Sequence, residues 1–157
     1  MVEPARLPSR LIRRAAEGDI TGLVALRRAM WDEMHPAAQA DEAMLLATDR
    51  YLHAELAAGR LLSWIVVEKD VPVGMALLLV HEHPPRITGR EVRGYVTAVF
   101  VERAHRRQGH ALALLQAIVE HARTHGFRRL MLRTSEDGRR VYESAGFRPL
   151  DVLAQDF

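Results

Sequence analysis

A short basic segment in the second half of the chain has the residue types of an anion-binding turn. It reads Arg-Arg-Gln-Gly-His-Ala at residues 106–111 and lies between a strand-like segment and a segment with helical spacing. The first N–H groups of a helix lack intrahelical acceptors, and the helix dipole gives them partial positive charge. Gly109 and Ala111 would let a phosphate approach the backbone closely, while Arg106 and Arg107 would add charge. The segment therefore predicts a site for a diphosphate-bearing cofactor.

Several other kinds of chemistry find no support in the sequence. The chain has no cysteine, which excludes disulfides, thiolate metal sites and an acyl-cysteine intermediate. His121 and His125 have the one-turn spacing of a metal-binding pair, but no third ligand is apparent, so we predict no metal. The Gly-Lys-Ser/Thr sequence and the three-glycine dinucleotide fingerprint are both missing, so other phosphate loops fit less well.

The elements that must position this turn follow from apolar periodicity and from turn residues. Residues 81–90, which contain Pro84, Pro85 and Gly89, are predicted to form a loop that overhangs a site. The order of elements predicts a mixed sheet with helices on both faces. In chain order, we expect a strand at 11–15, helices at 20–34 and from Asp41 to Gly59, strands at 62–68, 73–80 and 95–101, a helix at 112–122, a strand at 129–133, a short helix at 141–145 and a last strand at 148–153.

Length and composition predict a single domain over residues 1–157. The chain has 157 residues, 48% hydrophobic and 27% charged, without internal repeats or a linker. No apolar run approaches the roughly 20 residues that cross a bilayer, and Met1 to Arg10 lack the apolar core of a secretory signal, so we expect a cytoplasmic protein without a membrane partner. The formal net charge is only +2 and arginines alternate with acids, so no nucleic-acid partner is expected.

Four features together resemble the GNAT superfamily of N-acetyltransferases. They are the segment Arg106–Ala111, the helix after it, the strand at 129–133 and the sequence Val-Tyr-Glu-Ser-Ala-Gly-Phe at 141–147. The specific match covers the C-terminal half, and the N-terminal half agrees in element order. The resemblance implies the GNAT fold, an α/β domain of mixed α+β type with a central, mostly antiparallel mixed sheet and helices on both faces. It also implies acetyl-CoA as co-substrate and direct attack by a primary amine in a ternary complex.

The resemblance assigns cofactor contacts to the backbone around the turn. The pantetheine arm would lie along the strand formed by Val99, Phe100 and Val101. His110 departs from the small aliphatic residue common at its position, and we expect its ring to face either solvent or the phosphates. The pyrophosphate would be held by the loop amides of Arg106, Arg107, Gln108, Gly109, His110 and Ala111.

Two more side chains match positions that matter in the family. Tyr142 matches the usual general acid, which protonates the departing thiolate, and a phenol with a pKa near 10 is protonated at neutral pH. The alternative for Tyr142 is a tyrosine that packs on the helix. Ser135 stands where many members have asparagine; it would either hold coenzyme A or cap the helix.

The acceptor side is defined only by candidates. Many family members carry a glutamate on the strand that here reads Tyr-Val-Thr-Ala at 95–98, and this chain has no acid there. Trp31 and Met34 are predicted to border the acceptor pocket, with negative charge from acids at 32, 33, 41 and 42 to attract a cationic amine. The candidate bases are His81, Glu82, His83 and Glu91. Glu82 is also a candidate substrate contact.

Three functions remain open at this point. The first is acetylation of a small-molecule amine. The second is a coenzyme A-binding module that has lost catalysis, which the missing strand glutamate favours. The third is acetylation of a peptide amine at a protein N-terminus or lysine. The resemblance also makes a homodimer plausible.

Overall fold

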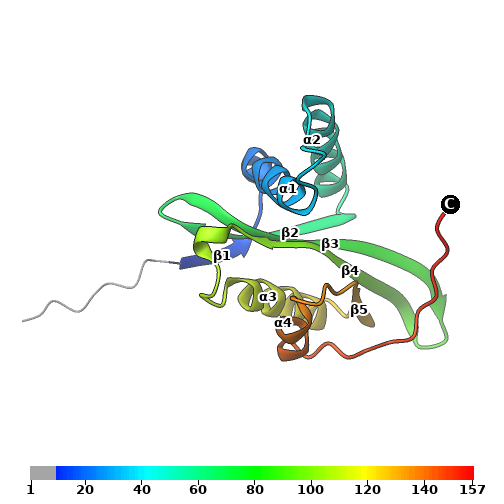
Figure 1. Ribbon diagram of the computed structural model, residues 1–157. Coiled ribbons are helices and arrows are strands. Elements are labelled where there is room, and N and C mark those ends of the chain that lie inside the picture. The colour runs from blue at the N-terminus through cyan, green and yellow to red at the C-terminus, as the bar shows by residue number, and fades with distance from the viewer. Residues whose placement is uncertain (1–9) are drawn as a thin grey trace, which may run out of the picture.

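The computed structural model describes residues 10–157 as a five-stranded sheet with helices on both faces (Figure 1). The strands lie side by side in chain order; the β4–β5 pair is parallel and the other three pairs are antiparallel. The expected mixed, mostly antiparallel sheet is thereby confirmed, while residues 1–9 and the prediction about their signal character lie outside the described residues. The strands are β1 (Arg10–Arg14), β2 (Leu61–Glu68), β3 (Val71–Arg86), β4 (Gly89–Val101) and β5 (Arg129–Leu132).

The helices form two layers, each closing one hydrophobic core against the sheet (Figure 1). On one face, Leu23 and Leu52 pack onto Ile65; on the other, Leu115 and Ile118 pack against the opposite side of the same strands. Both cores follow from the alternation of side chains along a strand. The helices are α1 (Ile20–Met34) and α2 (Glu42–Ala57) on the first face, and α3 (His110–Thr124) and α4 (Arg139–Ser144) on the second, with short 3-10 helices η1 (Glu17–Asp19) and η2 (Arg103–His105). Within the described residues, none of these helices has the length and apolar character needed to cross a membrane.

Local signals fixed most element boundaries. Asp41 caps α2, because its Oδ1 atom accepts a hydrogen bond from the N–H of Met44 at 2.8 Å. The β2–β3 hairpin turns at Lys69 and Asp70, whose φ angles of +49° and +64° match a two-residue turn with left-handed conformation at both positions. The helix predicted from Asp41 and the two strands predicted at 62–68 and 73–80 are thereby confirmed.

The predicted loop at 81–90 is wrong, because β3 and β4 continue into a long hairpin arm (Figure 1). His81 pairs with Arg93, and Arg86 pairs with Gly89 close to the tip. The register shifts between His83 and Arg86, which is where the two prolines lie. Proline lacks the N–H that a ladder needs and is tolerated at such irregularities. The prolines therefore mark an interrupted ladder and not the end of the strands.

The predicted last strand at 148–153 is also wrong. These residues have no regular secondary structure, and Leu153 is fully exposed while Val152 is largely exposed. An apolar run becomes a strand only when a neighbouring edge pairs with it, and the sheet ends at β5.

Candidate active site

Strand β4 contains a β-bulge beside its middle. Leu77 of β3 pairs with Thr97 and Met75 pairs with Phe100, so two steps along β3 correspond to three steps along β4. Ala98 lies inside this interval with φ +51°, a conformation that residues with a Cβ atom rarely adopt. Such strain persists where the surrounding fold imposes it, and it is common at functional sites.

Beyond the bulge, β4 leaves its parallel neighbour. The β4–β5 pairing runs from Arg93 opposite Arg129 to Val96 opposite Leu132 and stops there. Residues 97–101 of β4 therefore have no strand partner on the β5 side. Free N–H and C=O groups on a strand edge can pair with an extended ligand. Val99, Phe100 and Val101, predicted to hold a pantetheine arm, lie within this unpaired stretch.

The loop between β4 and α3 leads from this free edge to a helix start. Arg107 and Gly109 both have left-handed backbone, with φ of +63° and +78°, and Gly109 is the N-cap of α3. Because Gly109 has no Cβ, this backbone can be approached closely. The N–H groups of the first turn, starting at His110 and Ala111, have no carbonyl of the same helix before them. The expected loop and helix start are both present.

The Arg106 side chain is already used inside the protein. Its Nε atom donates to the carbonyl of Val101 at 2.8 Å, and its Nη2 atom donates to Oε2 of Glu33 at 2.8 Å. The guanidinium also lies over the ring of Phe100, 5.6 Å from its centroid. The hydrogen bond from Arg106 holds the pKa of the Glu33 carboxyl below its ordinary value. Arg106 thus connects the end of β4 to α1.

His110 is buried, so the expectation that its ring faces solvent or the phosphates is wrong. Its side chain points into the protein, where Nε2 lies 2.7 Å from Oε1 of Glu68, a contact within ion-pair distance that lacks hydrogen-bond alignment. Nδ1 of His105 lies 2.9 Å from the other oxygen of the same carboxyl. Burial raises the pKa of Glu68, but the two histidine contacts lower it by more, so the net pKa is below the ordinary value. Glu68, at the end of β2, therefore clamps the loop before α3.

Tyr142 is half-buried on α4, and this burial raises the pKa of its phenol above the ordinary value. The hydroxyl is therefore protonated at neutral pH. Gly138 lies directly against the ring, since a Cβ atom there would be 2.7 Å from Cε2 of Tyr142. The Oγ atom of Ser135 accepts a hydrogen bond from the N–H of Gly138 at 3.2 Å, but the N-cap of α4 is Gly138 itself, so Ser135 does not cap this helix.

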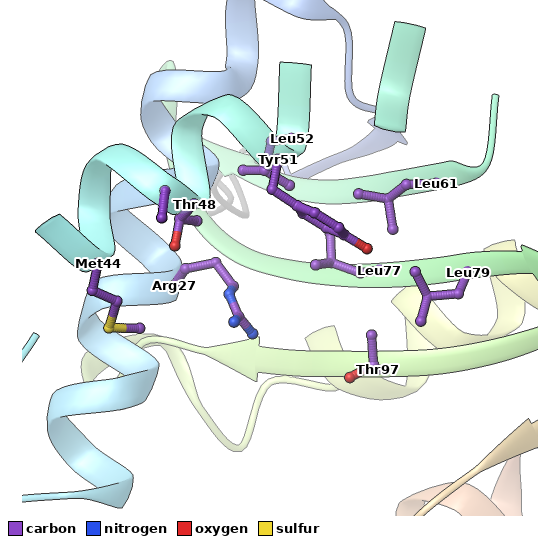
Figure 2. A pocket seen from close by; sticks show the side chains of 10 residues that line it. Arg27, Met44, Thr48, Tyr51, Leu52, Leu61, Leu77, Leu79 and Thr97 are labelled. Atoms are coloured by element: carbon purple, nitrogen blue, oxygen red, sulfur yellow. The ribbon is translucent and has the colours of Figure 1, made fainter. Parts of the chain in front are cut away.

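A cavity of about 530 Å³ lies on the opposite face of the sheet, between α1, α2 and the strands (Figure 2). Arg27 extends from α1 into this cavity, and Tyr51 of α2 covers it from the side. Thr97, next to the bulge, forms part of its wall. The residues that line it are Arg27, Met44, Ala47, Thr48, Tyr51, Leu52, Leu61, Leu77, Leu79 and Thr97.

The residues predicted to contact the acceptor lie elsewhere. Trp31 donates from Nε1 to the carbonyl of Ala38 at 2.7 Å, and Met34 is 64% exposed. Glu82 forms an ion pair with Arg90 on the exposed hairpin arm. None of the three predicted acceptor contacts lines the cavity.

The predicted acids and bases are likewise engaged or distant. Asp32 accepts from the N–H of Ala40 at 2.7 Å and Asp41 caps α2, so two of the four acids expected at the negative border hold backbone N–H groups. Glu91 is buried beneath Arg93, Arg86 and Arg128, and its pKa is low chiefly because Arg93 hydrogen-bonds to it. His81 and His83 lie exposed on the hairpin arm. His121 and His125 stack at 3.8 Å, and residues 10–157 contain no cluster of three or more metal-ligand side chains.

Sequence reasoning missed Arg27, Tyr51 and Thr97. One signal was available: Arg27 stands in the apolar stripe of α1 at helical spacing, where a charged side chain is out of place. Tyr51 and Thr97 give no comparable signal, because their place in the cavity depends on the tertiary structure.

A helix that starts at a glycine after a strand, a strand stretch without a β5 partner and a cavity lie on one sheet, as expected of a group-transfer enzyme with a long cofactor. Residues 20–147 match the acetyltransferase (GNAT) family, and the chain belongs to this family. The predicted family and fold are confirmed. Over 88 residues the chain is 33% identical to human N-acetyltransferase 8; the match covers 54% of this chain and 37% of that protein, so it spans little more than a third of the relative.

Solved structures show the same fold over almost the whole chain. A protein described as a predicted acetyltransferase from Clostridium acetobutylicum, solved with acetyl-CoA, has a TM-score of 0.79 and 25% identity and covers 94% of this chain and 96% of its own. An aminoglycoside N-acetyltransferase solved with CoA has a TM-score of 0.76 and 20% identity, with coverage of 99% and 98%.

Proposed function

We propose that this chain transfers an acetyl group from acetyl-CoA to a small-molecule primary amine within one ternary complex. The observation that carries the proposal is the continuity of β4. Thr97 lines the cavity, Ala98 forms the bulge, residues 99–101 have no partner strand on the β5 side among the described residues, and the loop after them leads to α3. A cofactor held along this path would bring its thioester to the wall of the cavity. Family membership and the two relatives solved with acetyl-CoA or CoA support the same reading.

The residues present fit the co-substrate. The amides at the start of α3 would bind the pyrophosphate, with Gly109 leaving room for it, and the β4 edge would bind the pantetheine arm. Acetyl-CoA supplies the activated acetyl group. Tyr142 holds a proton on its hydroxyl at neutral pH and would donate it to the departing thiolate.

The amine must lose a proton before or during attack, and among the described residues that line the cavity none is acidic. We propose that water carries this proton away, since Tyr51 at the cavity mouth is 46% exposed and the cavity is open to solvent there. The same absence of an acid favours the alternative of a coenzyme A-binding module without catalysis.

The dimensions of the cavity favour a small acceptor. A volume of about 530 Å³ falls within the range of roughly 300–1,000 Å³ that is typical of small-molecule sites. A peptide acceptor would need a groove that continues beyond α1 and α2.

The test is release of coenzyme A in the presence of a panel of primary amines and lysine peptides. Tyr142→Phe should lower kcat by about 100-fold or more, because it removes a general acid, while calorimetry should show the same acetyl-CoA affinity. An unchanged kcat would remove Tyr142 from the mechanism. Tight binding of acetyl-CoA with no turnover on any acceptor would establish the non-catalytic module instead.

A further inference from the structure

Arg27 places a positive charge in a cavity whose other walls are mostly apolar. Its side chain reaches from α1 into the space between Met44, Tyr51 and Leu77 (Figure 2). Burial lowers the pKa of the guanidinium, which nevertheless remains charged at any pH the protein encounters. A charge in such surroundings has lost part of its hydration and needs a compensating partner.

The described part of the chain, residues 10–157, does not supply that partner. Within residues 10–157, no carboxylate forms an ion pair with Arg27, and the Tyr51 phenol is the one titratable group that favours its charge. The acids on the same helix are occupied: Asp32 pairs with Arg28 and accepts a hydrogen bond from the N–H of Ala40, and Glu33 pairs with Arg106. A carboxylate on a ligand would supply the compensating charge.

We propose that the acceptor amine carries a carboxylate, which Arg27 binds inside the cavity. This inference deepens the proposed acetyltransferase function and rests on it. A guanidinium matches a carboxylate with two parallel N–H donors. Tyr51 and Thr48 add hydroxyl groups to the same wall. Leu52, Leu61, Leu77, Leu79 and Met44 would receive an apolar body, so the acceptor class is an apolar amino acid or a similar amino carboxylate.

A phosphate is the other anion that arginine binds, and the charge of the cavity decides against it. Arg27 is the only charged side chain among the described lining residues. One guanidinium balances the single charge of a carboxylate, whereas a phosphate monoester carries nearly two at neutral pH.

The experiment compares matched acceptors by coenzyme A release: leucine and phenylalanine, their amides, phenethylamine, and O-phosphoethanolamine as the phosphate arm. In the wild-type protein, kcat/KM for each amino acid should exceed that of its amide by at least about tenfold. Arg27→Gln should reduce this preference by about 10- to 100-fold, the value of a charge-assisted contact. Arg27→Lys keeps the positive charge but loses the paired N–H donors of the guanidinium. Its preference for the amino acid over the amide should lie between those of the wild-type protein and Arg27→Gln.

Arg28→Gln is the matched control. Arg28 is adjacent on α1, 56% exposed and outside the cavity lining, so its removal should leave the preference unchanged. The acetyl-CoA affinity of Arg27→Gln, measured by calorimetry, reports whether the variant is folded. Binding of 3-phenylpropionate, measured by calorimetry and compared with that of its amide, tests carboxylate binding in the wild-type protein without relying on any variant or on turnover.

The outcomes separate the two proposals. The carboxylate inference is overturned if the wild-type kcat/KM for the amides equals that for the amino acids. It is also overturned if Arg27→Gln lowers kcat/KM equally for both kinds of acceptor. Either result leaves acetyl transfer intact. Preference for O-phosphoethanolamine assigns Arg27 to a phosphate and overturns the carboxylate. No turnover on any acceptor overturns the proposed function, and if 3-phenylpropionate also fails to bind, the anion site is overturned independently.

Discussion

At the scale of single residues, the same side-chain type serves different ends depending on what surrounds it. Arg106 lies in the turn before α3, and its guanidinium is bonded to Glu33 and to the carbonyl of Val101. Arg27 lies in an apolar helix stripe, and no carboxylate among residues 10–157 pairs with its guanidinium. The sequence pattern does not show these partners, whereas the distances in the structure do.

Gly138 offers a test of how Tyr142 is held. A Cβ atom at position 138 would lie 2.7 Å from Cε2 of Tyr142 and 3.0 Å from Oγ of Ser135. Gly138→Ala should displace the phenol and lower kcat by about tenfold or more while acetyl-CoA affinity changes little, since general acid catalysis depends on position. Gly18→Ala is the control, because nothing lies within 4 Å of its Cβ position. Equal kcat values in the two variants would show that Tyr142 tolerates displacement.

At the scale of elements, the N-terminus of α3 is held from the far end of β2. Glu68 contacts His105 in η2 and His110 in the first turn of α3, so one carboxyl fixes both sides of the loop. His110, at a position that is usually aliphatic in the family, is thus buried against a partner on β2, Glu68.

Glu68→Gln should loosen that loop. A carboxylate presents one acceptor oxygen to each imidazole, whereas an amide has only one acceptor oxygen. We therefore expect a several-fold higher KM for acetyl-CoA with a smaller change in kcat. Glu120→Gln serves as the control, because Glu120 lies exposed on α3 and pairs with Arg123. A drop in kcat alone, measured by steady-state kinetics, would contradict a role of Glu68 in positioning the loop.

The elements that sequence predicted well are those fixed by local signals. Asp41 caps the start of α2 with its side chain, and Lys69 and Asp70 form the tight turn that joins β2 to β3. The hairpin arm and the absent last strand depend on pairing with distant residues, which no local pattern contains. The turn at 106–111 and the helix after it could be located from the sequence, whereas the cavity around Arg27 exists only once α1 and α2 meet the sheet.

At the scale of the whole molecule, charge is arranged so that folding stability depends on pH in two separate windows. Hydrogen bonds or ion pairs hold the pKa of Asp19, Glu33, Glu68 and Glu91 below ordinary values. A carboxyl with a depressed pKa stabilises the folded state above its unfolded pKa and loses this as pH falls through the folded value. These groups therefore predict acid destabilisation below about pH 4.5.

His121 adds a second pH range, above the first, in which folding stability changes with pH. Burial, His125 and Arg14 lower the pKa of His121 below its ordinary 6.5. Because the unfolded chain binds this proton more readily, stability should be complete above about pH 6.5 and decline as pH falls from there toward the folded pKa. His121→Gln should flatten the unfolding free energy between pH 7 and pH 5 in urea titrations, and the loss below pH 4.5 should persist in both proteins. An equal slope in the variant between pH 7 and pH 5 would assign that window to another group.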